Sequence, residues 1–285
     1  MPTFTPLQIE YDRFLDANGS QWNWGGHISF MAYKRSLDGE PLPDFVNLPK
    51  QCGSQVLVTL QMAHYIEQFY PAEYGDRYFA HMRPFAAALR DLGMYWCPIV
   101  FVDAQVVLPN RDQQQRFLSR LAEATAGEWN ILPSLGNEYP KNGFNPSDFT
   151  RPNNGLLWSR GSSLADTAPY YPSWDWKEFH PRRDWPKVLD GNFDGHYVMD
   201  GLSGNDEILD KPAPAISSEP IGFWHTDIPN RRSSDPNLAM VIGGTSIYYM
   251  RGGNFHSEEG LRSQPWSGRT EECARRYFKA LRQNE

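Results

Sequence analysis

Short apolar runs alternate along the chain with longer segments that carry apolar residues on one face. The runs are rich in β-branched and aromatic residues and are bounded by Gly, Pro or polar residues, which predicts buried strands. We place eight strands at 24–31, 55–61, 95–102, 129–135, 156–159, 174–180, 213–219 and 246–250. The longer segments predict helices over 76–92, 112–126, 235–243 and 270–281, and a shorter one near 44–52. Pro84 lies within the first long helix and predicts a kink there.

A turn signal precedes the first of these strands. Asn18 and Gly19 lie between two apolar runs, and Asn-Gly in that setting is typical of a tight β-hairpin. We therefore expect a short N-terminal hairpin at about residues 8–24.

The order of the elements predicts the fold class. Strands and helices alternate, and strands joined by helical crossovers pair in parallel, so we expect an α/β protein. Eight parallel strands favour a closed (β/α)8 barrel, which forms a single domain over residues 1–285 with the hairpin at its start. An open, doubly wound sheet is the alternative, but the chain contains neither GxGxxG nor GxxxxGK[ST], the phosphate-binding motifs of many such sheets.

Charge and hydropathy argue against several classes of protein. The chain has 27 Lys and Arg against 34 Asp and Glu, a net charge of -7, which disfavours a nucleic-acid partner because binding to a polyanion depends on clustered cations. No stretch approaches a membrane span in length, and residues 1–6 lack the basic and apolar parts of a signal peptide. We expect no membrane association and, by default, a cytoplasmic location or a place in a larger particle.

Cysteine and aromatic residues add two further indications. Cys52, Cys97 and Cys273 are odd in number and share no CxxC spacing, which indicates free thiols, and we expect neither a metal nor a cofactor. Aromatic residues are numerous, with 10 Trp, 14 Tyr and 16 Phe. Rings in such number suit either a groove that binds sugars or a large core.

Polar residues that follow the predicted strands supply the candidate chemistry. In a barrel the carboxyl ends of all strands point to one opening, so these residues are expected to meet there. Glu138 follows the fourth strand, next to Asn137, and Glu219 ends the seventh. Histidines at or near strand ends include His27, His64, His180 and His256. The alternative for each residue is an ordinary solvated position at the end of a strand.

Aromatic loops suggest where a substrate could bind. Loops 139–152, 170–176 and 224–230 combine aromatic residues with Asn and Pro, which suits the walls of a carbohydrate site. The candidates for stacking on sugar rings are Trp158, Trp174, Trp176, Trp224 and Trp266. Packing in the core is the alternative for each, because tryptophan is usually largely buried.

Two segments carry a resemblance to a known group of enzymes. Leu135-Gly136-Asn137-Glu138 and Ser217-Ser218-Glu219-Pro220 resemble the large clan of retaining glycoside hydrolases with (β/α)8 barrels, in which an Asn-Glu pair follows strand four and a second glutamate ends strand seven. The segment FLDANGSQWNWGG also resembles the short hairpin that leads many of these enzymes into strand one. The resemblance implies that Glu138 is the acid/base, that Glu219 is the nucleophile and that the partner is a carbohydrate substrate.

The implied reaction explains these residue types. In a retaining double displacement one carboxylate attacks the anomeric carbon while a protonated carboxyl donates to the leaving oxygen, and the two groups lie about 5–5.5 Å apart. Asn137 is then expected to hydrogen-bond the sugar 2-hydroxyl, and His180 to orient Glu219 or the substrate. The other expected substrate contacts are His27, Trp158, Trp176, Trp224, His256 and Trp266.

Two features depart from the pattern of the clan. Many relatives have His-x-Tyr after strand six and an aromatic residue, usually Trp, after strand eight. This chain has His180-Pro181-Arg182 and the segment 251–256, with Trp266 further on. Two alternatives therefore stay open: a carbohydrate-binding or structural barrel without catalysis, and a metal-dependent hydrolase on the same fold. The second is disfavoured by the lack of HExxH and of His-x-His after strand one.

Overall fold

A parallel sheet forms the centre of the protein. The computed structural model describes residues 4–10, 13–65, 67–161, 174–179, 221–223, 244–248, 275 and 278–279. Five strands pair in parallel in the order β10, β4, β5, β6 and β7. Their bounds are Gly244–Tyr248, Trp24–Ile28, Val56–Leu60, Tyr95–Phe101 and Ser134–Gly136. All residues of β4, β5, β6 and β7 are buried, which explains why the sequences of β5 and β6 are largely apolar and do not alternate with polar residues.

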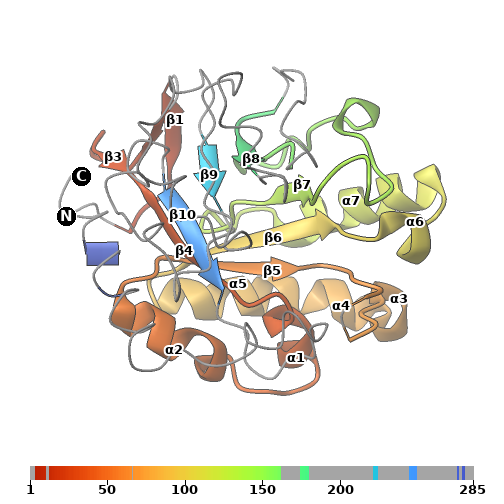
Figure 1. Ribbon diagram of the computed structural model, residues 1–285, viewed down its shortest axis with the longest axis horizontal. Coiled ribbons are helices and arrows are strands. Elements are labelled where there is room, and N and C mark those ends of the chain that lie inside the picture. The colour runs from red at the N-terminus through yellow and green to blue at the C-terminus, as the bar shows by residue number, and fades with distance from the viewer. Residues whose placement is uncertain are drawn as a thin grey trace, which may run out of the picture.

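The sheet continues beyond β7 in chain order. Ser159 forms parallel bridges to Ser134 on one side and to Trp176 on the other, so it occupies the place of the fifth strand. β8, Lys177–Phe179, then pairs in parallel with β9, Ile221–Phe223, and β9 lies beside β10 (Figure 1). The order of neighbours follows the order of the chain through eight positions, which is the strand order of a (β/α)8 barrel.

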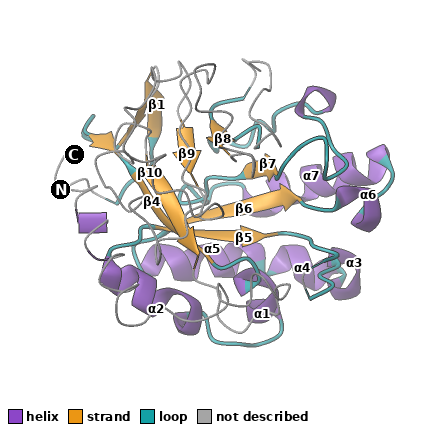
Figure 2. Ribbon diagram, viewed as in Figure 1, coloured by secondary structure: helices purple, strands orange, loops and turns teal. Residues whose placement is uncertain are grey.

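Helices between the strands cover the sheet. α1 and α2 follow β4, α3, α4 and α5 follow β5, and α6 and α7 follow β6 (Figure 2). Their bounds are Ala32–Leu37, Pro43–Cys52, Pro71–Tyr74, Asp76–Ala80, Met82–Asp91, Ala104–Val107 and Arg111–Thr125, and a short 3-10 helix spans Pro146–Asp148. Among the described residues, no helix combines the length and the apolar character needed to cross a membrane.

Aromatic packing on β6 fixes two of these helices. The Trp96 ring stacks on Tyr33 of α1, with centroids 5.3 Å apart, and meets Phe85 of α5 edge-on at 4.9 Å. Its Nε1 donates to Thr59 Oγ1 on the neighbouring strand β5 at 2.8 Å. One indole therefore joins two strands and two helices, and its polar atom is satisfied inside the core.

The expected N-terminal hairpin is present and covers the amino-terminal end of the strands. β1, Gln8–Glu10, β2, Arg13–Leu15, and β3, Gln21–Trp22, form an antiparallel sheet, with Asn18-Gly19 in the turn between β2 and β3. The rings of Phe14 and Trp22 reach the first residues of the barrel strands, with contacts from Trp22 to Trp24 and Tyr95 and from Phe14 to Trp176. The hairpin thus closes this end of the barrel with aromatic side chains.

The helix predictions are confirmed over most of the described chain. Helices occur at 44–52 and 112–126 within a residue or two of the expected ends. The segment 76–92 is divided at His81 into α4 and α5, and Pro84 lies in the first turn of α5, where its missing N–H costs no helical hydrogen bond. Residues 275, 278 and 279 are helical, as expected for the last segment, and Phe278 is buried. The helix expected at 235–243 lies outside the described residues.

Several strand bounds differ from the predictions. β7 spans Ser134–Gly136 where we expected 129–135, β8 spans Lys177–Phe179 where we expected 174–180, and the strand expected at 156–159 is present only as the bridge residue Ser159. We expected the seventh strand at 213–219, a segment outside the described residues. The strand at the seventh position of the sheet in the structure is β9, which begins at Ile221. Glu219 itself lies outside the described residues.

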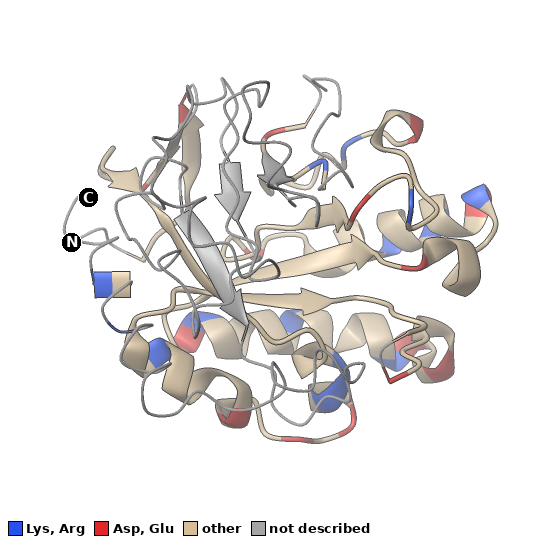
Figure 3. Cartoon of the chain, viewed as in Figure 1, with Lys and Arg blue, Asp and Glu red and all other residues tan. Residues whose placement is uncertain are grey.

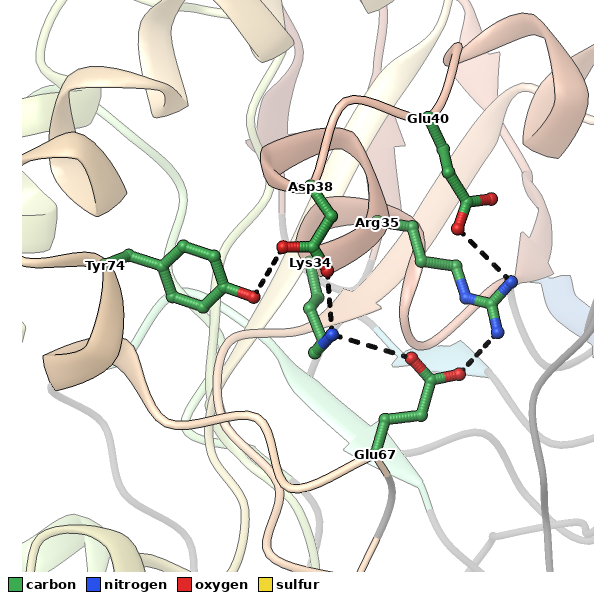
Figure 4. A network of polar contacts seen from close by, with 6 residues as sticks. All are labelled: Lys34, Arg35, Asp38, Glu40, Glu67 and Tyr74. Carbon is green, nitrogen blue, oxygen red and sulfur yellow. Dashed lines mark hydrogen bonds and ion pairs between the residues drawn. The ribbon is translucent and has the colours of Figure 1, made fainter.

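Charged side chains are absent from the central strands of the parallel sheet. Strands β4, β5 and β6 carry no Asp, Glu, Lys or Arg (Figure 3). One charged network fastens α1 to the loop after β5 (Figure 4). Arg35 pairs with Glu67 at 2.5 Å and with Glu40 at 3.6 Å, and Lys34 lies 3.9 Å from Glu67. The network continues through the pair of Lys34 with Asp38, whose carboxylate also accepts from the Tyr74 hydroxyl.

Glu67 links this loop to α1, and we expect its charge to contribute to stability. The Arg35 and Glu67 side chains are only 16% and 18% exposed, so Glu67→Gln leaves a partly desolvated guanidinium with a weaker partner. The free energy of unfolding should fall by about 1 kcal/mol in urea titrations. The control is Asp76→Asn, which removes a far more exposed ion pair with Arg120 and should leave the midpoint unchanged. Equal effects of the two substitutions would contradict the prediction.

Candidate active site

The loops after β5, β6 and β7 all begin at the same end of the sheet, the carboxyl end of its strands. Because these strands are parallel, their carboxyl ends lie side by side, and polar residues follow each of them (Figure 1). Gln61 follows β5, Asp103 lies after β6, and Asn137 with Glu138 follows β7. This is the edge at which barrel enzymes carry their catalytic residues.

Backbone packing places Asn137 and Glu138 directly against β6. The Asn137 N–H donates to the Phe101 carbonyl at 3.0 Å. A Cβ at Gly136 would lie 2.5 Å from the same carbonyl oxygen, and one at Gly161 would clash with the Gly136 oxygen. Both glycines allow neighbouring backbone segments to approach more closely than any side chain permits. The Asn-Glu pair therefore leaves the sheet from a tightly packed point.

Glu138 has a backbone conformation that is uncommon for a glutamate. Its φ is 47°, in the left-handed region, where a residue with a Cβ is strained. Its side chain is 12% exposed, and its carboxylate pairs with the Lys141 ammonium at 2.7 Å. The peptide bond between Tyr139 and Pro140 is cis. A strained, mostly covered carboxylate at the carboxyl end of a barrel strand is a candidate catalytic group.

Asn142 ties the loops after β6 and β7 together. Its Nδ2 donates to the Asn137 carbonyl at 2.8 Å, and its Oδ1 accepts from the Asp103 N–H at 3.3 Å. Its backbone carbonyl accepts from the Ala104 N–H at 2.9 Å. The side chain is buried, so these bonds are shielded from water. Asn142 thus holds two residues with left-handed backbone, Asp103 and Glu138, in a fixed relation.

Asp103 in turn organises the loop after β5. Its carboxylate accepts hydrogen bonds from the backbone N–H groups of His64 and Tyr65, at 3.0 and 3.2 Å. The exposed His64 ring meets the Tyr70 hydroxyl at 2.5 Å through Nδ1. The carboxyl ends of three consecutive strands are therefore linked by one chain of polar contacts.

Behind Glu138, an arginine supports the next residue of the loop. Arg160 follows the bridge residue Ser159, is buried, and donates to the Tyr139 hydroxyl, with its guanidinium 5.8 Å from the centre of that ring. The Tyr139 ring also meets Phe144 edge-on at 5.7 Å. Sequence reasoning did not single out Arg160, Lys141 or Asn142; the only signal was the Asn and Pro content of loop 139–152.

His27 is buried and does not reach the loops at the carboxyl end of the strands, so a role in binding substrate does not fit it. It lies within β4, and its ring is directed to α2, where Nε2 donates to the Phe45 carbonyl at 3.1 Å and Nδ1 lies 2.8 Å from the Ser54 hydroxyl. Burial lowers the pKa of His27 to about 3, although the hydrogen bond to Phe45 opposes this shift. His27 is therefore a neutral core residue.

Three of the expected stacking residues are also in the core. Trp158 is fully buried, and its Nε1 donates to Asn154 at 2.9 Å. Trp176 is buried against Trp24 and Phe14 at the amino-terminal end of the strands, opposite the candidate site. Trp174 is buried as well. Contact with a sugar ring does not fit these positions, because their rings already pack against protein.

The remaining predicted residues lie outside the part of the chain that the structure describes. They are Glu219, His180, Trp224, His256 and Trp266. Of the predicted site, the structure thus brings together Asn137 and Glu138, which it joins to Asp103 and His64. Within the described ranges, no group of three or more His, Cys, Asp or Glu side chains is arranged to hold a metal ion.

Comparison with known proteins establishes the fold. No protein-family model matches the sequence, and no curated protein matches it. Among solved structures, the chain is similar to the catalytic domain of an endoglucanase from Thermobifida fusca in complex with cellotetraose, with a TM-score of 0.55 and 14% identity over 97% of this chain and 98% of that one. The chain is also similar to a beta-glucanase from Saccharophagus degradans in complex with cellotetraose. The TM-score is 0.61, and the sequence identity is 11% over 98% of this chain and 94% of that one.

A third solved structure shares the same likeness. It is a glycoside hydrolase family 5 mannosidase from Rhizomucor miehei, with a TM-score of 0.60 and 10% identity over 98% of both chains. The likeness extends over nearly the whole of each chain. It agrees with the strand order described above, and the protein is a (β/α)8 barrel.

Protonation of His27 should make the protein less stable in acid. The unfolded chain binds a proton at this residue near pH 6.5, whereas the folded chain does so only near pH 3, so stability is lost as the pH falls between these values. Between pH 7.5 and 5, wild type should lose about 2 kcal/mol more unfolding free energy than His27→Gln. Urea titrations at several pH values measure this difference. Parallel profiles for wild type and His27→Gln would contradict the assignment.

The Asn142 side chain should contribute to the stability of the protein through the loops after β6 and β7. Asn142→Ala removes both of its hydrogen bonds and leaves the Asn137 carbonyl without this donor, so the free energy of unfolding should fall by about 2 kcal/mol. The control is Asn145→Ala in the same loop. Within the described part of the chain the Asn145 side chain bonds only to Ser147, so its loss should matter less. Chemical denaturation compares the two variants, and a larger loss for Asn145→Ala would refute this role of Asn142.

Proposed function

We propose that this protein is a retaining glycoside hydrolase that cleaves a glycosidic bond of an oligo- or polysaccharide. The observation that carries the proposal is the position of Glu138. It directly follows Asn137 at the carboxyl end of the fourth barrel strand, on a strained backbone and with a mostly covered carboxylate. The similarity to barrel structures of an endoglucanase, a beta-glucanase and a mannosidase supports the same reaction class.

Glu138 acts in this proposal as the acid/base. In the first step its carboxyl donates a proton to the oxygen that leaves the anomeric carbon, and in the second its carboxylate takes a proton from the attacking water. The buried backbone of Asn137, fixed to Phe101 and Asn142, orients the Asn137 amide toward the sugar 2-hydroxyl. These roles require a rigid loop, which the contacts of Asn142 supply.

Glu219 is the proposed nucleophile, on the resemblance of its surrounding sequence. Because β9 begins after Glu219, the first carboxylate that follows β9 in the chain, Asp227, is the competing candidate. His180, Trp224, His256 and Trp266 stay proposed substrate contacts. Cello- and manno-oligosaccharides are suitable first substrates, since the similar structures include enzymes named for glucan and mannoside hydrolysis.

Two other functions are distinguished by the same assays. A barrel that binds glycans without cleaving them is favoured by the departures from the clan pattern at 180–182 and 251–256. Binding without turnover by wild type would support it. A metal-dependent hydrolase would lose activity on chelation and regain it with zinc or manganese.

Glutamine substitutions test the assignment of the two glutamates. With unactivated oligosaccharides, Glu138→Gln should lower kcat/KM by about 100- to 10,000-fold, because general acid catalysis is lost. With an aryl glycoside whose leaving group needs no proton, glycosylation should survive, and added azide should accelerate turnover of Glu138→Ala and give a glycosyl azide of retained configuration.

The nucleophile is tested by a matched pair of variants. Glu219→Gln should abolish turnover of activated and unactivated substrates alike, because no covalent intermediate can form, whereas Asp227→Asn should retain most activity. The reverse result would transfer the nucleophile to Asp227. Full activity of Glu138→Gln on unactivated substrates would refute the proposed function.

A further inference from the structure

We propose that Lys141 is a positioning residue that acts through Glu138, by holding its carboxyl in place and favouring the ionised form. This inference rests on the proposed function, because it assumes that Glu138 is the acid/base. The ammonium of Lys141 lies 2.7 Å from Glu138 Oε2, within a charge-assisted hydrogen bond. No feature of the sequence motif calls for a lysine at this position.

The local backbone brings the two side chains together. Glu138 adopts the left-handed conformation, and the chain then turns back, with the Asn142 N–H directed to the Glu138 carbonyl at 3.4 Å and the Gly143 N–H bonded to the Pro140 carbonyl at 2.9 Å. The Glu138 side chain is 12% exposed and that of Lys141 is 55% exposed. Lys141 therefore approaches the carboxylate from the solvent side.

Other charged and titratable groups on the neighbouring loops are held by contacts of their own. Asp103, after β6, accepts from the backbone of His64 and Tyr65. His64, after β5, meets Tyr70, and Arg160, beside Tyr139, donates to the tyrosine hydroxyl. The Lys141 ammonium, in contrast, pairs directly with the Glu138 carboxylate.

The ion pair affects the two steps of the proposed reaction in opposite ways. In the first step the Glu138 O–H bond breaks and the proton goes to the leaving oxygen, while the nucleophile carboxylate replaces that oxygen on the anomeric carbon, so the neutral Glu138 carboxyl is required. In the second step the Glu138 carboxylate takes a proton from water, and the water oxygen bonds to the anomeric carbon as the bond from that carbon to the nucleophile breaks. Lys141 keeps its proton throughout. By stabilising the carboxylate, it assists the second step and limits the first at higher pH.

The pH profile of kcat/KM tests this role. The alkaline limb reports loss of the proton from the free enzyme's acid, so Lys141→Met should move it upward by about 0.5–1 pH unit, a shift moderated by the solvent exposure of the lysine. Lys141→Arg retains the charge and should keep the limb within about 0.2 units of wild type. Lys50→Met, at an exposed lysine of α2, is the control for loss of a charge elsewhere and should leave the profile unchanged.

A measurement independent of catalysis separates this inference from the proposed function. The Glu138 carboxyl carbon, assigned by comparison with Glu138→Gln, is titrated by NMR in the intact wild type and in Lys141→Met, and its midpoint should rise by the same amount as the kinetic limb. If Glu138 proves catalytic but neither the limb nor the carboxyl midpoint moves, the role of Lys141 is overturned. If wild type cleaves no glycoside, the proposed function and the catalytic role of Lys141 both fail, and the titration still shows whether the two groups interact.

Discussion

The close approach of β6 and β7 at their carboxyl ends is the constraint on which the candidate site depends. Gly136 lies against the Phe101 carbonyl, and the Asn137 N–H completes the contact at 3.0 Å. From this point the chain enters the left-handed conformation at Glu138, which is strained and must be held by its surroundings. Asn142 supplies that restraint, because its buried amide bonds to the loops after both strands. The position of Glu138 at this end of the sheet therefore depends on strand packing together with the contacts of Asn142.

The two ends of the barrel differ in chemistry for a physical reason. At the amino-terminal end, Trp22, Trp24, Tyr95 and Trp176 pack with the hairpin and exclude water. At the carboxyl end, backbone and side-chain polar groups of three loops bond to one another around Asp103 and Asn142. The first arrangement contributes apolar burial, and the second keeps polar groups satisfied close to solvent. The two ends of the same strands are thus stabilised by different kinds of interaction.

The ion pair between Glu138 and Lys141 adds a second level of organisation. Packing decides where the carboxylate lies, whereas the neighbouring ammonium influences how readily it holds a proton. If the protein is the retaining hydrolase proposed above, the balance between its two chemical steps is adjusted by a residue outside the Asn-Glu pair. Such an adjustment is open to substitution without disturbing the barrel, because the Lys141 side chain lies largely in solvent.

The sequence by itself determined the periodic elements and the place of one candidate pair, Asn137 and Glu138. Continuous apolar runs such as 56–60 and 95–101 could be recognised as buried strands, and Asn18-Gly19 identified the hairpin, because these signals depend on local geometry and burial alone. The position of Asn137 and Glu138 followed from the end of such a run. Only the tertiary structure decided that His27, Trp158 and Trp176 are buried in the core. It also decided the contacts at residues 137–139, which are those of Asn142 with Asn137, Lys141 with Glu138 and Arg160 with Tyr139. The physical reason is that the direction and partners of a side chain depend on segments distant in the chain, which periodicity does not encode.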